Sequence, residues 1–258
     1  MSLEFVCLAA GRGTRMGRLG AYLQKCMYPV GLRPFLELTM AQAAGAGGAR
    51  VHVVVGHHAE QVAAYFGSEF GGMRVEYVRQ DEPLGTGHAL GLLAERLAGA
   101  ARVLVWQGDV YVPSAVFAAL DAHGSPNAVT LVSEPEAGPE LLATVEGDRV
   151  RRVWGGAGPL SDGGVWKLEA RLLAALGGRG APSGPLTAGV PGGSRAPSRA
   201  ANAEVRALAN LQRLIDAGEA EVGAVVVGTR LHLGGTHPTP EANVAGVVRR
   251  LLAEGHGR

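Results

Sequence analysis

The stretch FVCLAAGRGTRMGR, residues 5–18, joins a run of apolar residues to a glycine-rich segment that carries three arginines. A short run that is apolar throughout is typical of a strand buried on both faces of a sheet. Glycine and basic residues directly after such a strand indicate either a phosphate-binding loop or an ordinary glycine turn. Because the chain contains 40 glycines, Gly11 and Gly13 alone do not decide between these two interpretations.

Two common phosphate-binding loops do not fit this stretch. A Rossmann dinucleotide loop needs Gly-x-Gly-x-x-Gly and an acid at the end of the second strand to bind the ribose. The third glycine, Gly17, comes one place too late, and the second apolar run ends in VVVGHH (53–58) without an acid. A P-loop needs Gly-x-x-x-x-Gly-Lys followed by Ser or Thr, which is absent here. Backbone N–H groups, the Thr14 hydroxyl and the Arg15 and Lys25 cations remain as candidate triphosphate ligands.

The pattern on either side of this stretch predicts an α/β fold. Short apolar runs alternate with helical stretches up to about residue 133, which favours a parallel sheet covered on both faces. We expect strands at 5–9, 51–55, 75–78, 103–106 and 129–132, and helices at 34–44, 59–66, 86–97 and 114–123.

The second half of the chain has a different pattern. We expect two short strands within 141–153, a strand at 163–168, helices at 170–176, 203–217 and 240–254, and strands at 222–227 and 230–233. Residues 177–200 are rich in Gly, Pro, Ser and Arg, which predicts a mobile loop. We interpret residues 1–258 as a single domain with a nucleotide-binding half (1–133) and an acceptor-binding half (134–258).

Composition restricts the class of protein. A net charge of +1 gives no sign of a nucleic-acid partner or an anionic membrane surface. The two cysteines, Cys7 and Cys26, cannot form a disulfide framework, so a reduced cytoplasmic protein is expected. No apolar run approaches the roughly 20 residues of a membrane helix, and we see no signal peptide. The sequence does not determine the oligomeric state, and a homo-oligomer is one of the possible states.

The opening stretch resembles the signature of the sugar-phosphate nucleotidyltransferases, the NDP-sugar pyrophosphorylases. That pattern reads Leu-Ala-(Ala/Gly)-Gly-x-Gly-Thr-Arg-(Met/Leu), then Pro-Lys, Pro-(Val/Ile) and a basic residue before Pro. The matching residues are Leu8, Ala9, Ala10, Gly11, Gly13, Thr14, Arg15, Met16, Lys25, Pro29, Val30, Arg33 and Pro34. The sequence departs from the pattern at Gln24, where proline is usual.

Three further blocks resemble the family in the same order along the chain. These are RVHVVVGHHAEQVAAYFG (50–67), RQDEPLGTGHAL (79–90) and VLVWQGDVYV (103–112). The second is similar to the base-recognition segment of bacterial N-acetylglucosamine-1-phosphate uridyltransferases. Four ordered blocks make a chance match improbable, even in a glycine-rich chain.

The resemblance implies a three-layer α/β/α Rossmann-like nucleotidyltransferase fold with a mostly parallel mixed central sheet. It also implies Mg²⁺-dependent transfer from UTP or dTTP to a sugar 1-phosphate. Arg15 and Lys25 would be catalytic, Asp109 would hold Mg²⁺, and the nucleotide would be bound by Leu8, Ala9, Ala10, Gly11, Gly13, Thr14, Gln80, Gly85 and Thr86. Two alternatives remain open, because Thr86 could cap the following helix and Asp109 could be a surface turn residue.

The match is weaker in the second half. VRRVWGGAGPL (150–160) lacks the Glu-Lys pair of the family, which Arg151 or Arg152 could replace. SDGGVWKLE (161–169) resembles the strand that faces the acceptor, so we expect Asp162 and Gly164 to contact it.

For the second metal ligand the sequence offers three candidates. Relatives place an Asp or Asn near the C-terminus, and Asn243 is the best candidate here, with His232 and His237 as poorer ones. Asn243 could equally be an ordinary residue in the first turn of a helix. A non-sugar acceptor (phosphocholine-like or a molybdenum cofactor precursor) and a degenerate nucleotide-binding regulatory protein are the alternative functions.

Overall fold

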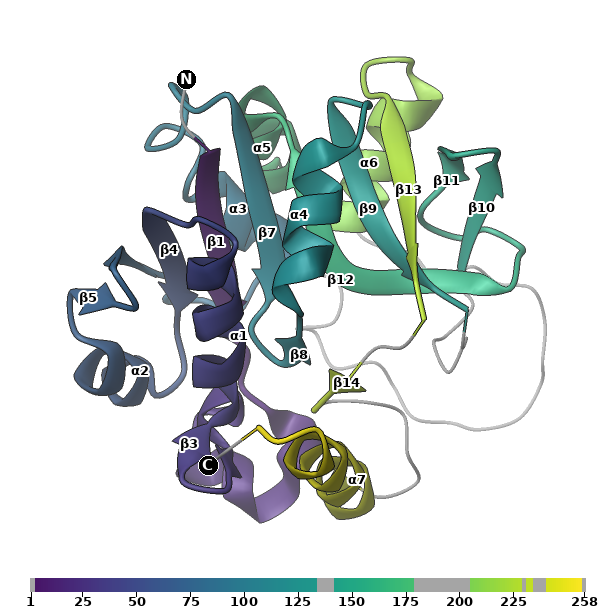
Figure 1. The fold of residues 1–258 in the computed structure, drawn as a ribbon. Helices are drawn as coiled ribbons and strands as arrows, with labels where there is room; N and C mark the ends of the chain where they lie inside the picture. The colour runs from purple at the N-terminus through teal and green to yellow at the C-terminus, as the bar shows by residue number, and fades with distance from the viewer. Residues whose placement is uncertain (1–2, 134–141, 179–204, 229–230, 234–239, 257–258) are drawn as a thin grey trace, which may run out of the picture.

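The computed structural model describes residues 3–133, 142–178, 205–228, 231–233 and 240–256. A ten-stranded sheet lies between two layers of helices (Figure 1). The front layer in Figure 1 contains α1 (Phe35–Gly45) and α4 (Ser114–Ala122). The layer behind contains α3 (Thr86–Gly91), α5 (Leu173–Gly177) and α6 (Ala207–Asp216), which pack against one another. The predicted three-layer α/β/α class is therefore confirmed.

The sheet is mixed, with a parallel half built from the N-terminal residues. Its order is β10-β11-β13-β9-β12-β7-β1-β4-β6-β5. The parallel half consists of β7 (Arg102–Gln107), β1 (Leu3–Ala9), β4 (Arg50–Val55) and β6 (Met73–Arg79). The short strand β5 (Glu69–Phe70) is antiparallel to β6 at the edge.

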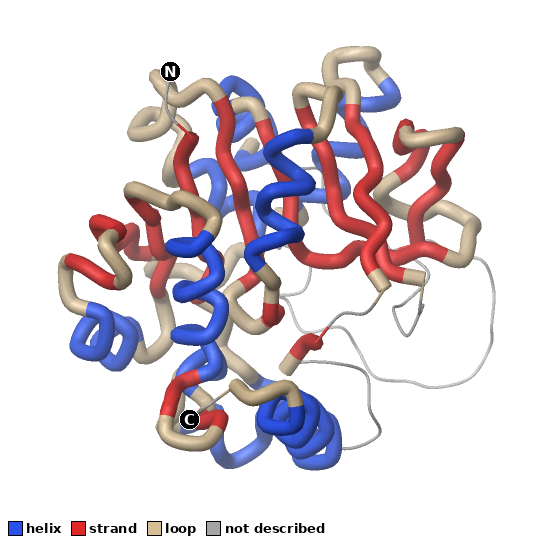
Figure 2. Tube along the Cα trace, viewed as in Figure 1, coloured by secondary structure: helices blue, strands red, loops and turns tan. Residues whose placement is uncertain are grey.

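The other half of the sheet is mainly antiparallel. Long β12 (Leu160–Leu168) is antiparallel both to β7 and to β9 (Asn127–Val132), which in turn is parallel to β13 (Val222–Val227). The hairpin of β10 (Leu142–Glu146) and β11 (Arg149–Arg152) completes this half. Figure 2 shows the strands of both halves behind the front helices.

Alternation along β1 explains how the sheet is covered on both faces. Phe5 and Cys7 belong to the apolar cluster that contains Leu36 of α1 and Phe117 of α4, whereas Val6 belongs to the cluster under α3 and α6. Successive strand residues point to opposite faces, so a strand that is apolar throughout is buried by helices on each side. This is the reason the opening stretch predicts the layered fold correctly.

Short elements lie at the lower end and at the left side of the molecule in Figure 1. At the lower end are the 3₁₀ segments η1 (Thr14–Ala21) and η2 (Lys25–Met27), the pair β2 (Pro29–Val30) and β3 (Arg33–Pro34), and helix α7 (Pro240–Ala253). Helix α2 (Ala59–Phe66) lies at the left, next to β5. Helix α7 packs against η1 and β2. A further 3₁₀ turn, η4 (Ala170–Leu172), precedes α5.

Two predicted elements differ from the structure. The helix expected over 86–97 ends at Gly91 in α3, and residues 92–99 continue as turns. At Gly91 the helix packs closely on α5, since a Cβ there would lie 2.8 Å from the Gly177 Cα. The strand expected over 230–233 is the two-residue β14 (Leu231–His232), which pairs with β8 (Val110–Tyr111) instead of joining the large sheet. Most of the predicted loop 177–200 lies outside the described residues.

Four loops of the parallel half meet at one edge of the sheet. The carboxyl ends of parallel neighbours face the same way, and α/β sites form there. A Cβ on Gly56, after β4, would lie 2.9 Å from Ala10 O and 3.0 Å from Gln80 O, so the chain segments after β1, β4 and β6 are in contact. Gly108, after β7, donates its N–H to Leu8 O at 2.9 Å.

Among the helices of the described residues, none has the length and apolarity that a membrane crossing requires.

Candidate functional site

The loop after β1 packs directly on the segment that contains Lys25. Gly13 has a φ of 61°, and a Cβ on it would lie 3.1 Å from Lys25 Cβ. The chain then folds back through η1, so that a Cβ on Gly20 would lie 2.6 Å from Gly13 O. Gly11 and Thr14 are exposed and can meet a ligand. Arg15 lies in η1, but its side chain is outside the described part of the structure, so its catalytic role stays a prediction.

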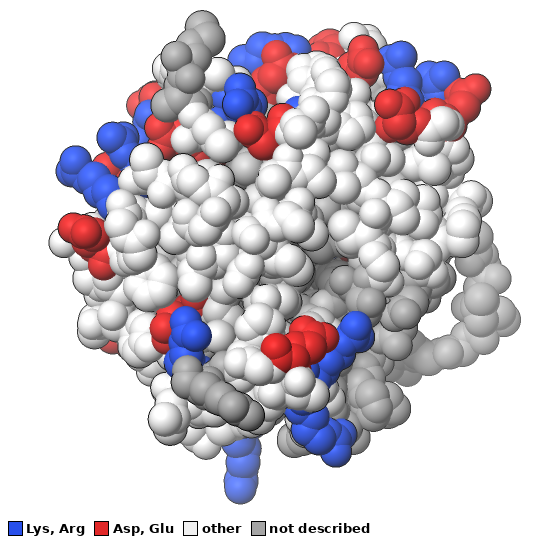
Figure 3. All heavy atoms as spheres, in the orientation of Figure 1, with Lys and Arg blue, Asp and Glu red and all other residues white. Residues whose placement is uncertain are grey.

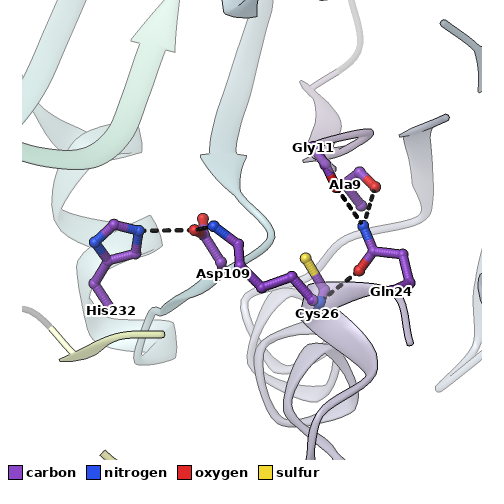
Figure 4. A network of polar contacts seen from close by, with 7 residues as sticks. Ala9, Gly11, Gln24, Cys26, Asp109 and His232 are labelled. Carbon is purple, nitrogen blue, oxygen red and sulfur yellow. Dashed lines mark hydrogen bonds and ion pairs between the residues drawn. The ribbon is translucent and has the colours of Figure 1, made fainter. Parts of the chain in front are cut away.

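Gln24 fixes this loop from the position where proline is usual. Its φ of −64° is the value that proline imposes, which explains why the two residues are interchangeable in the backbone. The side chain is buried; Nε2 donates to Ala9 O at 2.7 Å and to Gly11 O at 3.4 Å, and Oε1 accepts from Cys26 N (Figure 4). The backbone N–H donates to Gln61 Oε1 at 2.8 Å. Gln24 thus ties the glycine loop to the chain on both sides of Lys25.

We expect Gln24→Ala to weaken nucleotide binding. The change leaves Ala9 O and Cys26 N without their side-chain partner, at a cost of about 1–3 kcal/mol each if they stay buried. The Michaelis constant for the nucleotide should rise about tenfold for every 1.4 kcal/mol lost from binding, with a smaller change in kcat. Gln24→Glu is the matched variant, because its carboxylate would face two carbonyl oxygens and should be worse than alanine. Equal Michaelis constants in all three proteins would contradict this role.

The polar centre of the site joins three elements that are far apart in sequence. Lys25 Nζ of η2 contacts Asp109 Oδ2, and His232 Nε2 of β14 lies 2.7 Å from the same oxygen (Figure 4). The side chains of Lys25, Asp109 and His232 are only 14%, 10% and 15% exposed. The β14–β8 pairing sets His232 opposite Val110, and Leu233 N donates to Asp109 O at 2.9 Å.

Asp109 is held as a carboxylate. Burial alone would raise the pKa of Asp109, but Lys25 and His232 lower that pKa well below its usual value.

Lysine is rare in this chain: only Lys25 and Lys167 occur, so arginine supplies nearly all of the 24 basic residues. Both ammonium groups contact an acceptor inside the protein, Asp109 Oδ2 and His123 O respectively. A compact ammonium fits where the larger guanidinium would not.

The ligand atoms at this edge fit a divalent cation whose remaining ligands come from the substrate and from water. Asp109 Oδ2 and His232 Nε2 converge, whereas the described residues contain no group of three or more His, Cys, Asp and Glu side chains that could hold a metal. Mg²⁺ is commonly bound through one or two carboxylates plus substrate phosphates. Asn243 lies in α7 with its side chain outside the described part, and His237 is outside the described residues. The metal role of Asn243 stays a prediction.

The predicted base segment lies at the end of β6 and the start of α3. Gly85 has φ 95° and ψ 178°, a conformation that is essentially restricted to glycine. Gln80 is buried, and its Nε2 lies 3.0 Å both from Gly85 O, to which it donates, and from His88 Nδ1. Thr86 does not cap α3 with its side chain; its Oγ1 instead accepts from Ala207 N at 3.1 Å. The hydroxyl of Thr86 therefore connects α3 to α6, and its contact with a nucleotide stays a prediction.

The predicted acceptor residues lie in a bulge of β12. Between Asp162 and Trp166 the register with β9 shifts, and Thr130 Oγ1 fills the gap by bonding both the N–H and the C=O of Val165. Asp162 is 2% exposed, and its Oδ1 accepts from Gly164 N at 3.0 Å and Trp166 Nε1 at 2.8 Å. Its carboxylate thus holds the bulge. Direct contact of Asp162 and Gly164 with an acceptor stays a prediction.

The acceptor half also contains an exposed ion pair and a cavity. Arg151 pairs with Glu146 across the β10–β11 hairpin and is half exposed. A cavity of about 170 Å³ lies beside the bulge, lined by residues that include Val110, Thr130, Gly163 and Val227. Figure 3 shows this face hollowed beside the lower end of α4, with most charged side chains along the upper rim. The largely apolar lining suits packing against part of an acceptor better than binding its phosphate.

The two cysteines lie beneath the polar centre and should be unreactive. A Cβ on Gly108 would lie 3.1 Å from both Cys7 Sγ and Cys26 Sγ. Burial and the nearby Asp109 raise the pKa of Cys26 to about 12, and burial raises that of Cys7 as well. At pH 8 neither thiol is then ionised in the folded protein, whereas in the unfolded chain the pKa returns to about 8.5. We expect both thiols to react with Ellman's reagent only after unfolding; rapid reaction of the native protein would contradict this burial.

The sequence predicts Lys25 and Asp109 for one site, and the structure brings their side chains into contact. His232, a poorer metal candidate by sequence, lies 2.7 Å from the same carboxylate oxygen. In the sequence Gln24 is only a departure from a pattern, although its side chain makes three hydrogen bonds at this site. The signal for Gln24 was the polar residue in place of a proline. The sequence held no comparable signal for His232, since a two-residue strand gives no periodic pattern.

Comparisons with known proteins identify the family of this chain. The sequence matches the family described as "MobA-like NTP transferase domain" over residues 5–183. The bifunctional protein GlmU of Geobacter metallireducens is 38% identical over 133 residues, which are 50% of this chain and 27% of that protein. The CMP-5'-(3-aminopropyl)phosphonate synthase of Streptomyces rubellomurinus is 34% identical over 144 residues, 55% of this chain and 23% of that protein. The matched region thus spans about a quarter of these relatives' length.

Solved structures share the fold over nearly the whole chain. A UDP-glucose pyrophosphorylase complexed with UDP-glucose superposes with a TM-score of 0.74 at 16% identity, covering 98% of this chain and 100% of the other. The UDP-glucose pyrophosphorylase of Acinetobacter baumannii gives 0.73 at 18% identity, covering 99% and 95%. At these identities the likeness shows the fold, and the residue roles rest on the geometry described above.

Proposed function

Because the chain belongs to the MobA-like NTP transferase domain family, we propose that it transfers a nucleotidyl group from a nucleoside triphosphate to a phosphate-bearing acceptor. The proposed donor is UTP or dTTP, the acceptor a sugar 1-phosphate, the cofactor Mg²⁺ and the second product pyrophosphate. The observation that carries this proposal is the contact of Lys25 with Asp109 directly beside the glycine loop after β1.

The chemistry needs positioning and charge more than a strong base. An oxygen of the acceptor phosphate forms a new bond to the α-phosphorus. At the same time the bond between the α-phosphorus and the oxygen that bridges to the β-phosphate breaks. Pyrophosphate leaves with the electron pair of the broken bond. The nucleophile is already an anion, so no side chain has to remove a proton. Lys25 lies against the loop and would stabilise the negative charge that develops on the α-phosphate and the leaving group. A bound divalent cation would supply further charge neutralisation at Asp109.

The base segment has an acceptor that a pyrimidine donor could use. Gln80 Nε2 is directed to Gly85 O and His88 Nδ1, which leaves Gln80 Oε1 for a ligand. An amide oxygen would accept from the N3–H of uracil or thymine, or from the N4 amino group of cytosine. Gly85, without a side chain, would leave the face of the base unobstructed.

A second acceptor class is supported by one comparison. The Streptomyces relative named as a CMP-5'-(3-aminopropyl)phosphonate synthase is about as similar to this chain as the GlmU proteins are. The acceptor half here also lacks the Glu-Lys pair of sugar-phosphate enzymes. A small phosphonate or other non-sugar phosphate, with CTP as donor, is therefore the alternative substrate pair.

A pyrophosphate-release assay tests both versions of the proposal. The purified protein is incubated with UTP, dTTP, CTP, ATP or GTP, each combined with sugar 1-phosphates or with small phosphonates and phosphocholine, in Mg²⁺. We expect release that depends on both a pyrimidine triphosphate and one acceptor class. Release with a sugar 1-phosphate supports the first version, and release only with a non-sugar acceptor supports the second.

A further inference from the structure

We propose that His232 is the second protein ligand of the divalent cation at Asp109, and that its imidazole shifts the site's preference from Mg²⁺ towards first-row transition-metal ions. The inference deepens the proposed function, since it concerns the cation of the same site. It differs from the expectation from sequence, in which the amide of Asn243 was the preferred second ligand.

Backbone hydrogen bonds on both sides of His232 fix the position of this residue next to Asp109. Strand β14 pairs with β8, which sets His232 opposite Val110, the residue after Asp109. Leu233 N donates to Asp109 O at 2.9 Å on the other side of His232. Two backbone anchors therefore bring the imidazole to the carboxylate, and Nε2 ends 2.7 Å from Oδ2 (Figure 4).

The two donor atoms are close enough to share one ion. Ligand atoms of a first-row cation lie about 2.0–2.2 Å from it, so an Nε2–Oδ2 separation near 3 Å is needed, and 2.7 Å requires only a small widening. Both side chains remain 10–15% exposed, which leaves an approach for the ion. Lys25 contacts the same Oδ2; when a cation takes that oxygen, the ammonium group can turn to a phosphate.

Donor chemistry then determines which ion is favoured. Mg²⁺ prefers oxygen ligands and holds its water tightly. Imidazole suits the later first-row ions, whose affinities for such sites rise from Mn²⁺ to Co²⁺ and beyond. A site with one carboxylate and one imidazole should therefore bind Co²⁺ more tightly than Mn²⁺, and Mn²⁺ more tightly than Mg²⁺.

Metal binding by His232→Asn tests this ligand without any need for turnover. Asparagine keeps a polar group of similar reach but removes the ring nitrogen. Calorimetric titration with Co²⁺ and with Mg²⁺, each alone, should show that the ratio of Co²⁺ to Mg²⁺ affinity falls about tenfold or more in the variant. Pulsed EPR of Mn²⁺ with the protein in excess should show ¹⁴N coupling from a bound imidazole in the wild type and its loss in the variant.

His58→Asn is the matched control. His58 lies in the turn before α2 at a φ of 52°, a left-handed conformation that asparagine accepts well. We expect wild-type metal affinities and wild-type ¹⁴N coupling in this control. Far-ultraviolet circular dichroism and the melting temperature of His232→Asn should stay near the wild-type values, because the β14–β8 pairing is made by backbone atoms.

The outcomes separate this inference from the proposed function. Absent ¹⁴N coupling in the wild type, or an unchanged affinity ratio in His232→Asn, overturns the role of His232 even if the protein forms nucleotidyl products. Loss of the ¹⁴N coupling together with a lower Co²⁺ to Mg²⁺ affinity ratio in His232→Asn supports the role, even if no acceptor is turned over; in that case only the proposed function fails.

Discussion

Asp109→Asn should lower the rate of pyrophosphate formation by about 10³-fold, the upper range for loss of one strong electrostatic group in an active site. Asparagine keeps the volume and can still accept the hydrogen bond from His232, but it removes the charge that pairs with Lys25 and would bind the cation. The rate is measured with saturating nucleotide and acceptor, so that the change in kcat is separated from binding.

Asp121→Asn is the matched control for this change. Asp121 is in α4 and pairs with Arg102 at the surface, away from the polar centre. Exposed ion pairs contribute little to stability, so this variant should keep wild-type turnover. Comparable rates for Asp109→Asn and Asp121→Asn would show that Asp109 has no part in the reaction.

Lys25→Met should lower kcat by about 10²–10³-fold, because it removes the positive charge that would stabilise the α-phosphate and the leaving group. Methionine retains the apolar stem that packs on Gly13 but removes the ammonium group. The variant should at the same time bind the divalent cation at least as tightly as the wild type, because Lys25 no longer competes for Asp109 Oδ2. Lys167→Met, at the other lysine, is the chemical control, since Nζ of Lys167 contacts His123 O instead of the site.

The opposite effects of these two variants on metal binding give the stronger test. Asp109→Asn should lose both catalysis and cation affinity, whereas Lys25→Met should lose catalysis alone. If Lys25→Met lost cation affinity to the same extent as Asp109→Asn, the two residues would serve only to hold the local structure.

The fold could be predicted from the sequence because its signals are local. The apolar runs of β1, β4, β6 and β7 and the helices between them can be recognised one at a time, and parallel neighbours then bring Gln80 and Asp109 to the edge that carries the glycine loop. The resemblance to the sugar-phosphate nucleotidyltransferases, confirmed at the level of family, rests on the same N-terminal residues.

What could not be predicted depends on contacts between distant segments. His232 and Asp109 are 123 residues apart in the chain, and they meet through the pairing of two two-residue strands. Asp162 Oδ1 accepts hydrogen bonds from Gly164 N and Trp166 Nε1 within the bulge of β12, a structural role that the sequence pattern did not indicate. Thr86 resembles a helix cap, but its hydroxyl holds the start of α6.

At the Lys25–Asp109 centre, the nucleotidyl group with its α-phosphate is proposed to move from the triphosphate to the acceptor, with release of pyrophosphate. The most direct test of this proposal is the transfer of label from α-³²P-UTP, dTTP or CTP to the panel of phosphate and phosphonate acceptors, with Asp109→Asn in parallel. We predict a labelled nucleotidyl product with one acceptor class in the wild type, reduced about 10³-fold in the variant. Calorimetric binding of a nucleotide without labelled product from any acceptor would contradict the account and favour a nucleotide-binding regulatory protein.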